Sequence, residues 1–238
     1  MNPTEHQSKQ FDADLTALRT RVVEMAGLVD EQFRRAIEAL TTGRTMLAEE
    51  VVAKDASVNA LEVRIDDACA HLIAKRQPAA SDLRMVLGVS KIVSELERIG
   101  DKARKIARLT VKVRDGGAVE GSWIGDIERL AERARQMLRE SLNAFVRSDL
   151  EAAVSVLRNN RDFARDTSVT SNEVVRRMSA QPSDVPALLD MLSMTRAVDR
   201  VADHAANIAE HLVYIVRGTD VRHATLEQIE REALAPRG

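Results

Sequence analysis

The sequence predicts an all-α protein made of two tandem, homologous antiparallel three-helix bundles with six long helices. Aromatic residues make up only 3% of the 238 residues, against 45% apolar and 30% charged residues, which favours aliphatic packing between helices over a sheet. Six long segments are rich in helix-forming residues. In addition, the stretch Ser81–Val113 reappears without a gap 102 residues later as Ser183–Ile215. Such a repeat indicates two versions of one structural unit.

The predicted helices follow one another through short breaks. Glycine, proline or polar residues separate them, and the helices span 12–41, 45–76, 82–114, 123–147, 149–180 and 184–217. Because short connections join antiparallel neighbours, each set of three should form one bundle. Ser81 and Ser183 suit the N-caps of the third and sixth helices.

These breaks define the domain organisation that we predict. The first repeat covers residues 1–115 and the second covers residues 122–217. The remainder, 218–238, is a polar tail with one short amphipathic stretch. We expect that stretch to be a loosely docked or frayed helix, because chain ends fray unless they are held by packing.

The third and sixth helices show the clearest apolar pattern. Residues spaced alternately by four and three form a coiled-coil-like seam in each copy. The seam of the third helix consists of Ile92, Leu96, Ile99, Ala103, Ile106, Thr110 and Val113, and that of the sixth consists of Met194, Val198, Val201, Ala205, Ile208, Leu212 and Ile215. These two seams are the predicted core.

Both copies carry two carboxylates four residues apart, Glu97 with Asp101 and Asp199 with Asp203. At ~100° per residue, both pairs fall nearly opposite the apolar seam and should face away from their own core. Like charges at this spacing cost a helix ~0.2–0.5 kcal/mol, yet the pair recurs at the same phase. Asn207 continues the second stripe, one turn further on.

Oxygen ligands of this kind suit metal ions such as Mg²⁺, Mn²⁺ or Fe. Two carboxylates cannot complete a six-coordinate shell, so waters, bridging oxo groups or a second helix must supply the other ligands. Candidates on the neighbouring helices are Asn59, Glu62, Asp66, Asp162 and Asp166. The alternative is that each pair is a solvated helix face neutralised by nearby cations, for example Asp101 by Lys105.

Composition narrows the possible partners and the compartment. The formal net charge of −2 gives no overall field that attracts nucleic acid or anionic lipid. The opening Met1–Gln10 is polar, and no run approaches the ~20 apolar residues that cross a bilayer. We therefore expect a cytoplasmic protein. Cys69 is the sole cysteine, which excludes a thiolate-cluster zinc site, and its alanine neighbours indicate a buried side chain.

The sequence resembles the PhoU family of phosphate-signalling regulators. The resemblance is carried by Leu96–Asp101 and Asp199–Glu210, which match a doubled Glu/Asp-x-x-x-Asp signature, and by Gln77–Arg84, which matches a second family hallmark. It extends from about Phe11 to Gly218. The doubled motif, the preceding segment and the six-helix layout together are far more specific than one carboxylate pair.

The resemblance implies a cytoplasmic, non-enzymatic regulator of phosphate uptake that is usually a homodimer. It would bridge the phosphate transporter's ATPase subunit and a membrane sensor histidine kinase, and thereby keep phosphate-starvation genes off. It also implies metal ions, such as Fe, Zn, Mn or Mg, at surface carboxylates. Carried over to this chain, the metal candidates are Glu97, Asp101, Asp199, Asp203 and Asn207. Lys102 and Lys105 stand where the family usually has His and Asn, and a cationic Lys105 one turn from Asp101 can replace a metal's charge there.

Three other functions remain to be weighed. A ferritin-like di-iron enzyme needs inward-facing Glu-x-x-His pairs, and the sequence contains none. A transcription factor needs a basic recognition helix, which is not apparent, so we expect no direct contact with nucleic acid and membrane contact only through partners. A metal-free helical adaptor, whose acidic stripes bind basic partner surfaces, cannot be separated from the metal-binding adaptor by composition.

Overall fold

The computed structural model describes residues 3–115 and 123–236, and the side chains of residues 11–114 and 123–236. The described chain forms α1 (Pro3–Thr42), α2 (Thr45–Arg76), α3 (Ala80–Asp115), α4 (Trp123–Arg147), α5 (Leu150–Ala180), α6 (Val185–Arg217) and α7 (Leu226–Leu234), with a 3₁₀ turn at Pro182–Asp184. The predicted all-α fold with six long helices and two repeated units is therefore confirmed.

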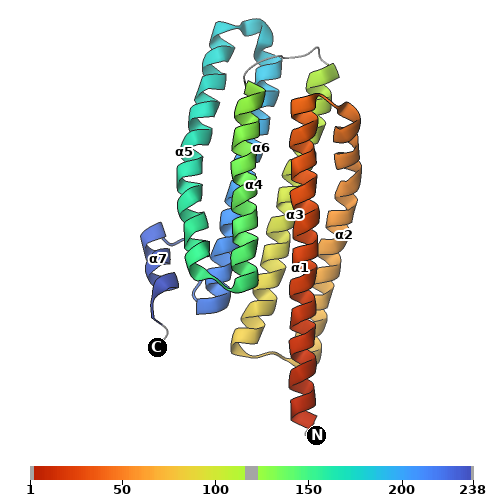
Figure 1. The fold of residues 1–238 in the computed structure, drawn as a ribbon, viewed down its shortest axis with the longest axis vertical. Coiled ribbons are helices and arrows are strands. Elements are labelled where there is room, and N and C mark those ends of the chain that lie inside the picture. Colours follow the sequence, from red (N-terminus) through yellow and green to blue (C-terminus); the bar gives the residue numbers. More distant parts are fainter. Residues whose placement is uncertain (1–2, 116–122, 237–238) are drawn as a thin grey trace.

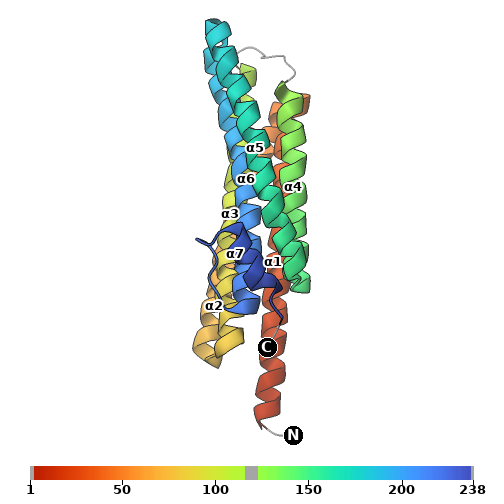
Figure 2. The ribbon, with the colours of Figure 1, turned by 90° about the vertical axis from the view of Figure 1, so that its left-hand side faces the viewer.

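The helices are arranged in two layers (Figures 1 and 2). Helices α2, α3, α6 and α5 lie side by side, while α1 packs on α2 and α3, and α4 packs on α5 and α6. The central helices α3 and α6 contact each other as closely as they contact their own bundles. Most of the predicted seam is fully buried, including Leu96, Ile99, Val198 and Val201. The two halves therefore share one continuous core.

The turns between helices explain the boundaries. Gly43, Gln77, Ser148 and Gly218 all have positive φ values, and this left-handed conformation ends a helix. At the start of α5, the carboxylate of Asp149 accepts a hydrogen bond from the amide of Ala152 at 3.0 Å. The predicted serine caps were wrong: α3 already begins at Ala80, and the 3₁₀ turn that contains Ser183 precedes α6.

The C-terminal tail is held more firmly than we predicted. Thr225 and Gln228 form a capping box that starts α7. Ile229 and Ala233 of α7 are buried, and the helix packs against α5. In addition, the guanidinium of Arg217 donates to the carbonyl oxygen of Ala233 at 2.6 Å. Apolar burial and capping together make α7 a docked helix rather than a frayed one.

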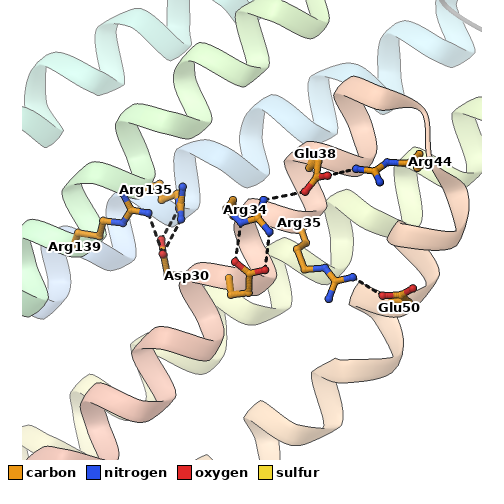
Figure 3. Close-up of polar contacts among 9 residues, drawn as sticks. Asp30, Arg34, Arg35, Glu38, Arg44, Glu50, Arg135 and Arg139 are labelled. Carbon is orange, nitrogen blue, oxygen red and sulfur yellow. Dashed lines mark hydrogen bonds and ion pairs between the residues drawn. The ribbon is translucent and has the colours of Figure 1, made fainter.

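The two halves are related by an approximate two-fold axis. Helices α3 and α6 run antiparallel, so Gly88 of α3 lies against Ile215 of α6, where an added Cβ would come within 2.3 Å of the isoleucine side chain. On the opposite layer, Asp30 of α1 accepts hydrogen bonds from Arg135 of α4 at 2.6 and 2.9 Å (Figure 3). These two residues are 105 positions apart, which is the offset that aligns the first two helices of each half.

Two further sequence expectations concern single features. Cys69 is buried, as predicted, and burial together with the charge of Asp66 raises the pKa of its thiol to about 11. Among residues 3–115 and 123–236, no helix combines the length and apolarity that a bilayer crossing requires.

Candidate functional site

Both carboxylate pairs lie at the edge of the bundle, where the third helix of each half meets the second. We expected them to face away from the core, but all four side chains are only partly exposed. The reason is that α3 and α6 are each covered on three sides, by two helices of their own half and by the other half. The free face of α3 is the neighbouring stripe with Leu87, Arg98, Lys105 and Lys112. We call the two acidic edges the first seam (α2 with α3) and the second seam (α5 with α6). These two names refer to the acidic edges and not to the apolar seams of α3 and α6 described above.

The first seam centres on an arginine between two carboxylates. Arg104 of α3 donates to Asp55 of α2 at 2.5 Å and also pairs with Asp101. Asp55 is a buried charge, only 3% exposed, and Gln32 of α1 donates to its other oxygen at 3.2 Å. A buried carboxylate needs such partners, because desolvating an unpaired charge costs several kcal/mol.

The first seam also carries uncompensated negative charge. Burial, followed by the charges of Asp101, Glu62 and Asp55, raises the pKa of Glu97. The pKa of Glu62 is raised too, mainly by burial and partly by the charge of Asp66, against a hydrogen bond from Ser94 that lowers it. One arginine therefore serves several carboxylates, and a cation that approached here would relieve their repulsion.

The second seam uses two neutral donors and one arginine. Thr167 of α5 donates to Asp199 at 2.7 Å, and Asn160 of α5 donates to Asp203 at 3.3 Å. Arg200, on the same helix as the pair, donates to the second oxygen of Asp203 at 2.9 Å. Burial raises the pKa of Asp199, opposed by the Thr167 hydrogen bond. Beside this seam lies a hollow of about 380 Å³ that is lined by Asp203, Asn207 and residues of the α7 segment.

The two seams differ by a matched exchange of residues. Asn160 takes the place of Asp55 at the 105-residue offset, and Ala206 takes the place of Arg104 at the 102-residue offset. An aspartate buried at this position needs a cation, whereas a neutral asparagine does not and reaches the motif carboxylate directly. Sequence reasoning missed Asp55, Asn160 and Thr167. The 105-residue offset that aligns Val51 with Val156 also aligns Asp55 with Asn160, and Glu62 with Thr167.

The other candidate metal ligands on α2 and α5 have different partners and positions. Glu62 is in the first seam, while Asp66 accepts a hydrogen bond from Ser90 at 2.6 Å. Asp162 and Asp166 pair with Arg165 and Arg133 instead of turning toward the second seam. Asn59 is only partly exposed. Among the described residues, the cation paired with Asp101 is Arg104 rather than Lys105.

Asn207 belongs to a polar cluster between the halves. Its amide donates to Glu95 of α3 at 3.0 Å, and Nδ1 of His204 lies 2.7 Å from the same oxygen. Nε2 of His211 lies 3.8 Å from the other oxygen of Glu95. Glu95 and His211 are both buried. Burial alone would raise the pKa of Glu95, but the hydrogen bonds from His204, His211 and Asn207 hold it well below its usual range.

This cluster has no equivalent on the other side of the axis. The positions that correspond to Glu95, His204 and Asn207 hold Ala197, Lys102 and Lys105. Ala197 thus replaces the carboxylate in the same place where Lys102 and Lys105 replace the His and Asn that the family usually has. His204 and His211 of α6 thus both contact the first half, through Glu95 of α3.

Glu210 gives this region a pH dependence that can be measured. Burial, and then the charges of Asp220 and Glu95, raise the pKa of Glu210 from 4.5 to about 7. The Glu210 carboxyl thus ionises more easily in the unfolded chain than in the folded protein. Its contribution to the free energy of unfolding therefore declines as the pH rises through about 7. At about pH 8, Glu210→Gln should increase the free energy of unfolding by about 1–2 kcal/mol, after allowance for partial exposure. At about pH 4, below the ordinary value of 4.5, the gain should nearly vanish. Urea denaturation at both pH values measures this, and an equal gain at both would contradict it.

The oxygen donors of both seams match the ligand preference of hard and borderline cations. Among the described residues, however, no group of three or more histidine, cysteine, aspartate or glutamate side chains is arranged to hold a metal ion. A metal ion at either motif pair would therefore take two oxygens from the pair and need most of its remaining ligands from solvent. Asn207 would contribute only after release from Glu95, or through its carbonyl oxygen.

The fold and seams define the class as a duplicated three-helix-bundle protein with an equivalent acidic edge in each half. The PhoU domain model matches residues 22–110 and 127–212, one match in each half. The chain belongs to the PhoU family. This confirms the family that the sequence motifs indicated.

The chain is similar to curated relatives over nearly its whole length. It is 38% identical over 229 residues to the phosphate-specific transport system accessory protein PhoU homolog of Pseudomonas putida, covering 96% of this chain and 89% of the relative. It is 36% identical over 231 residues to the phosphate-specific transport system accessory protein PhoU of Escherichia coli (strain K12), covering 97% and 95%.

Solved structures show the same fold. The crystal structure of PhoU from Pseudomonas aeruginosa matches with a TM-score of 0.84 and 36% identity, covering 88% of this chain and 100% of that chain. The crystal structure of the phosphate transport system regulatory protein PhoU from Streptococcus pneumoniae matches with a TM-score of 0.82 and 28% identity, covering 89% and 99%.

Proposed function

We propose that this protein is a cytoplasmic, non-enzymatic regulator of phosphate uptake and a negative regulator of the phosphate-starvation response. It acts as a metal-binding adaptor between the ATPase subunit of the phosphate transporter and a sensor histidine kinase. Family membership supports the link to phosphate transport, because the relatives are named as accessory or regulatory proteins of that system. The observation that carries the metal-binding part is the acidic pair found at the same seam in both halves.

The contrast between the seams refines the metal proposal. The first seam holds more carboxylates, and Arg104 bridges two of them, whereas in the second seam Arg200 pairs with Asp203 alone and the other donors are neutral. Arg104 therefore competes with a metal ion for two carboxylates of the first seam, whereas Arg200 competes for one carboxylate of the second. We therefore propose that Asp199 and Asp203 bind a divalent or iron-type ion more readily than Glu97 and Asp101.

Metal content tests this proposal directly. Elemental analysis of purified protein should show that Asp199→Ala with Asp203→Ala removes most of the bound metal, and that Glu97→Ala with Asp101→Ala removes less. The matched control is Asp162→Ala with Asp166→Ala, which deletes two exposed carboxylates of α5 outside the seam. Equal metal content in all variants would refute the site and favour the metal-free adaptor.

The adaptor role has its own test. The protein should co-purify with the transporter ATPase and with the sensor kinase at low salt, and the complexes should weaken as salt screens the charged surfaces. Failure to associate with either partner at high protein concentration would count against the adaptor role. Light scattering of the isolated protein tests the accompanying proposal that it forms a homodimer.

A metal-free adaptor remains the second candidate. The raised pKa values of Glu97 and Asp199 show carboxylates that favour a positively charged neighbour, and an arginine or lysine of a partner would serve as well as a metal ion. Chelation separates the two, because only the metal-bound form should lose thermal stability when a chelator removes a ligand that binds the native state.

A further inference from the structure

A hollow of about 620 Å³ lies where α1, the start of α3, the α4–α5 turn and the end of α6 meet. Figure 1 shows these segments toward the end of the bundle from which the N-terminus projects. We call it the basal hollow. Its polar lining consists of Arg19, Arg217, Ser81, Ser148 and Asp82. The volume lies within the ~300–1,000 Å³ of typical small-molecule sites, so the hollow has room for more than a single ion.

The two arginines of the basal hollow have no carboxylate partner among the described residues. Arg19 donates to the thioether sulfur of Met85 at 3.8 Å, which is a weak acceptor. Arg217 donates through Nε and Nη2 to the carbonyl oxygens of Ala233 and Ala235. Nε of Arg19 is enclosed and therefore out of a ligand's reach, but Nη1 of neither arginine is enclosed or hydrogen-bonded within the described chain. Each arginine thus offers one accessible N–H group.

The remaining polar groups leave the basal hollow positively charged. The hydroxyl groups of Ser81 and Ser148 form no hydrogen bond in the described part of the chain, so both can donate to a ligand. Asp82 supplies one negative charge at an exposed side chain. A third arginine, Arg84, lies close by, because a Cβ added to Gly218 would be 3.3 Å from its guanidinium carbon. Three guanidinium groups outweigh one carboxylate, and the hollow therefore favours an anion.

The equivalent positions in the other half show that the fold does not require these arginines. At the offset of 105 residues Ile124 replaces Arg19, and at the offset of 102 residues Asp115 replaces Arg217. Ile124 packs against the core with an ordinary apolar side chain. The helix positions can thus be filled without positive charge, and the pair of arginines is a property of this end of the bundle alone.

The open space is also particular to this end. Gly43 takes the place of Ser148 at the equivalent turn, and Arg114 takes the place of Val216. Arg114 covers the Gly43 turn so closely that an added Cβ would lie 2.5 Å from its guanidinium carbon. Val216 is too short to cover the Ser148 turn in the same way, which leaves the basal hollow open.

The lining specifies the chemistry of the ligand. The accessible donors come from four segments and therefore from different sides, which suits the tetrahedral oxygens of a phosphate group better than a planar carboxylate. A guanidinium also matches phosphate in charge and in geometry. The other walls are the apolar side chains of Leu15, Met85, Ile215 and Val216. An organic group attached to the phosphate would bury apolar surface against them.

We propose that the basal hollow binds a soluble phosphate monoester, with the phosphate group held by Arg19 and Arg217 and the organic group packed against Leu15, Met85 and Ile215. The hollow lies away from both motif pairs. This inference therefore goes beyond the adaptor function, and it stands or falls independently of metal binding.

Isothermal titration calorimetry of the full chain tests the proposal, in buffer with a chelator so that metal ions at the seams do not bind phosphate. The probes are phenyl phosphate, inorganic phosphate and benzoate. Phenyl phosphate should bind at least several-fold more tightly than either of the others, because it alone carries both the phosphate group and the apolar ring. Sedimentation with vesicles that contain phosphatidic acid tests the same chemistry in a lipid headgroup.

Two variants on α1 form a matched pair. Arg19→Ile installs the residue found at the equivalent position of the other half and should weaken phenyl phosphate binding about ten-fold or more. Arg21→Ile removes the same charge from an exposed side chain outside the hollow and should leave binding unchanged.

Asp82→Asn supplies a test in the opposite direction. The change removes the carboxylate from the lining and should tighten phenyl phosphate binding several-fold. Asp82 is exposed, so this variant should fold even where Arg19→Ile does not.

Four outcomes would overturn the proposal. Benzoate or inorganic phosphate could bind as tightly as phenyl phosphate, which would remove the need for a phosphate monoester. Folded Arg19→Ile could retain full binding, or Arg21→Ile could weaken it equally, which would leave only an effect of overall charge. Asp82→Asn could fail to tighten binding. Finally, binding to the vesicles without binding of phenyl phosphate would assign the arginines to a membrane surface.

Discussion

Replacing Asp30 with arginine should reduce the free energy of unfolding by about 2–4 kcal/mol. Asp30 of α1 forms ion pairs with Arg135 and Arg139 of α4, and the Asp30 and Arg135 side chains are only 21% and 14% exposed. An arginine here would place three guanidinium groups together where water screens them weakly. The ion pair is one of the contacts that join the two halves (Figure 3). Chemical denaturation measures the loss.

Charge reversal provides the control for this prediction. Asp30→Arg combined with Arg135→Asp re-forms the pair with opposite polarity and should recover at least half of the lost stability. Asp162→Arg is the matched surface control: Asp162 is 67% exposed and pairs with Arg165 of its own helix, so the change should cost under ~1 kcal/mol. If the double variant is no more stable than the sum of its single changes predicts, the pair does not couple the halves.

Removing the carboxylate of Glu95 should cost about 2–4 kcal/mol. Glu95→Ala leaves His204 and Asn207 without their acceptor, and His211 without its neighbouring carboxylate, in the buried contact between α3 and α6. Each buried polar group that loses its partner pays a desolvation penalty, and the shorter side chain leaves a cavity. Glu95→Gln keeps the size and one acceptor oxygen, so its loss should be smaller.

Glu97, two residues away, is the matched control for Glu95. Its pKa is raised by burial and by neighbouring carboxylates, so its charge opposes folding and Glu97→Ala should cost little in metal-free buffer. For Glu95 the sign is opposite: its pKa is depressed, so its contribution is complete above the ordinary value of 4.5 and is lost as the pH falls below it. Denaturation at several pH values should show the gap between Glu95→Ala and the original chain shrinking in acid. A gap that does not change with pH would contradict this account.

Much of the fold follows from the sequence because its signals are local. The seven-residue pattern of Ile92, Ile99 and Ile106 predicts a buried face through helical periodicity alone. Gly43 and Gly218 end helices because they readily adopt positive φ. The α7 helix was underestimated because its stability comes from the contact of Ile229 and Ala233 with the rest of the fold, which no local pattern reveals.

The candidate site was predicted less completely, because its partners come from different helices. Periodicity placed Glu97 and Asp101 on one side of α3, but the depth of that side depends on α2 and α6 packing around it. Neither Asp55 nor Thr167 belongs to a recognisable motif, so only tertiary contact shows that they reach the motif carboxylates.

The sequence by itself determined the six long helices, the duplication, the family and the repeated acidic pair, since these properties depend on residue spacing along one chain. The tertiary structure decided how the two copies differ: Arg104 bridges two carboxylates in the first seam, neutral Asn160 and Thr167 serve the second, and Glu95 joins two histidines only once across the axis. The physical reason is that charge and burial depend on neighbours brought together by folding, so two similar sequences acquire different electrostatics when their surroundings differ.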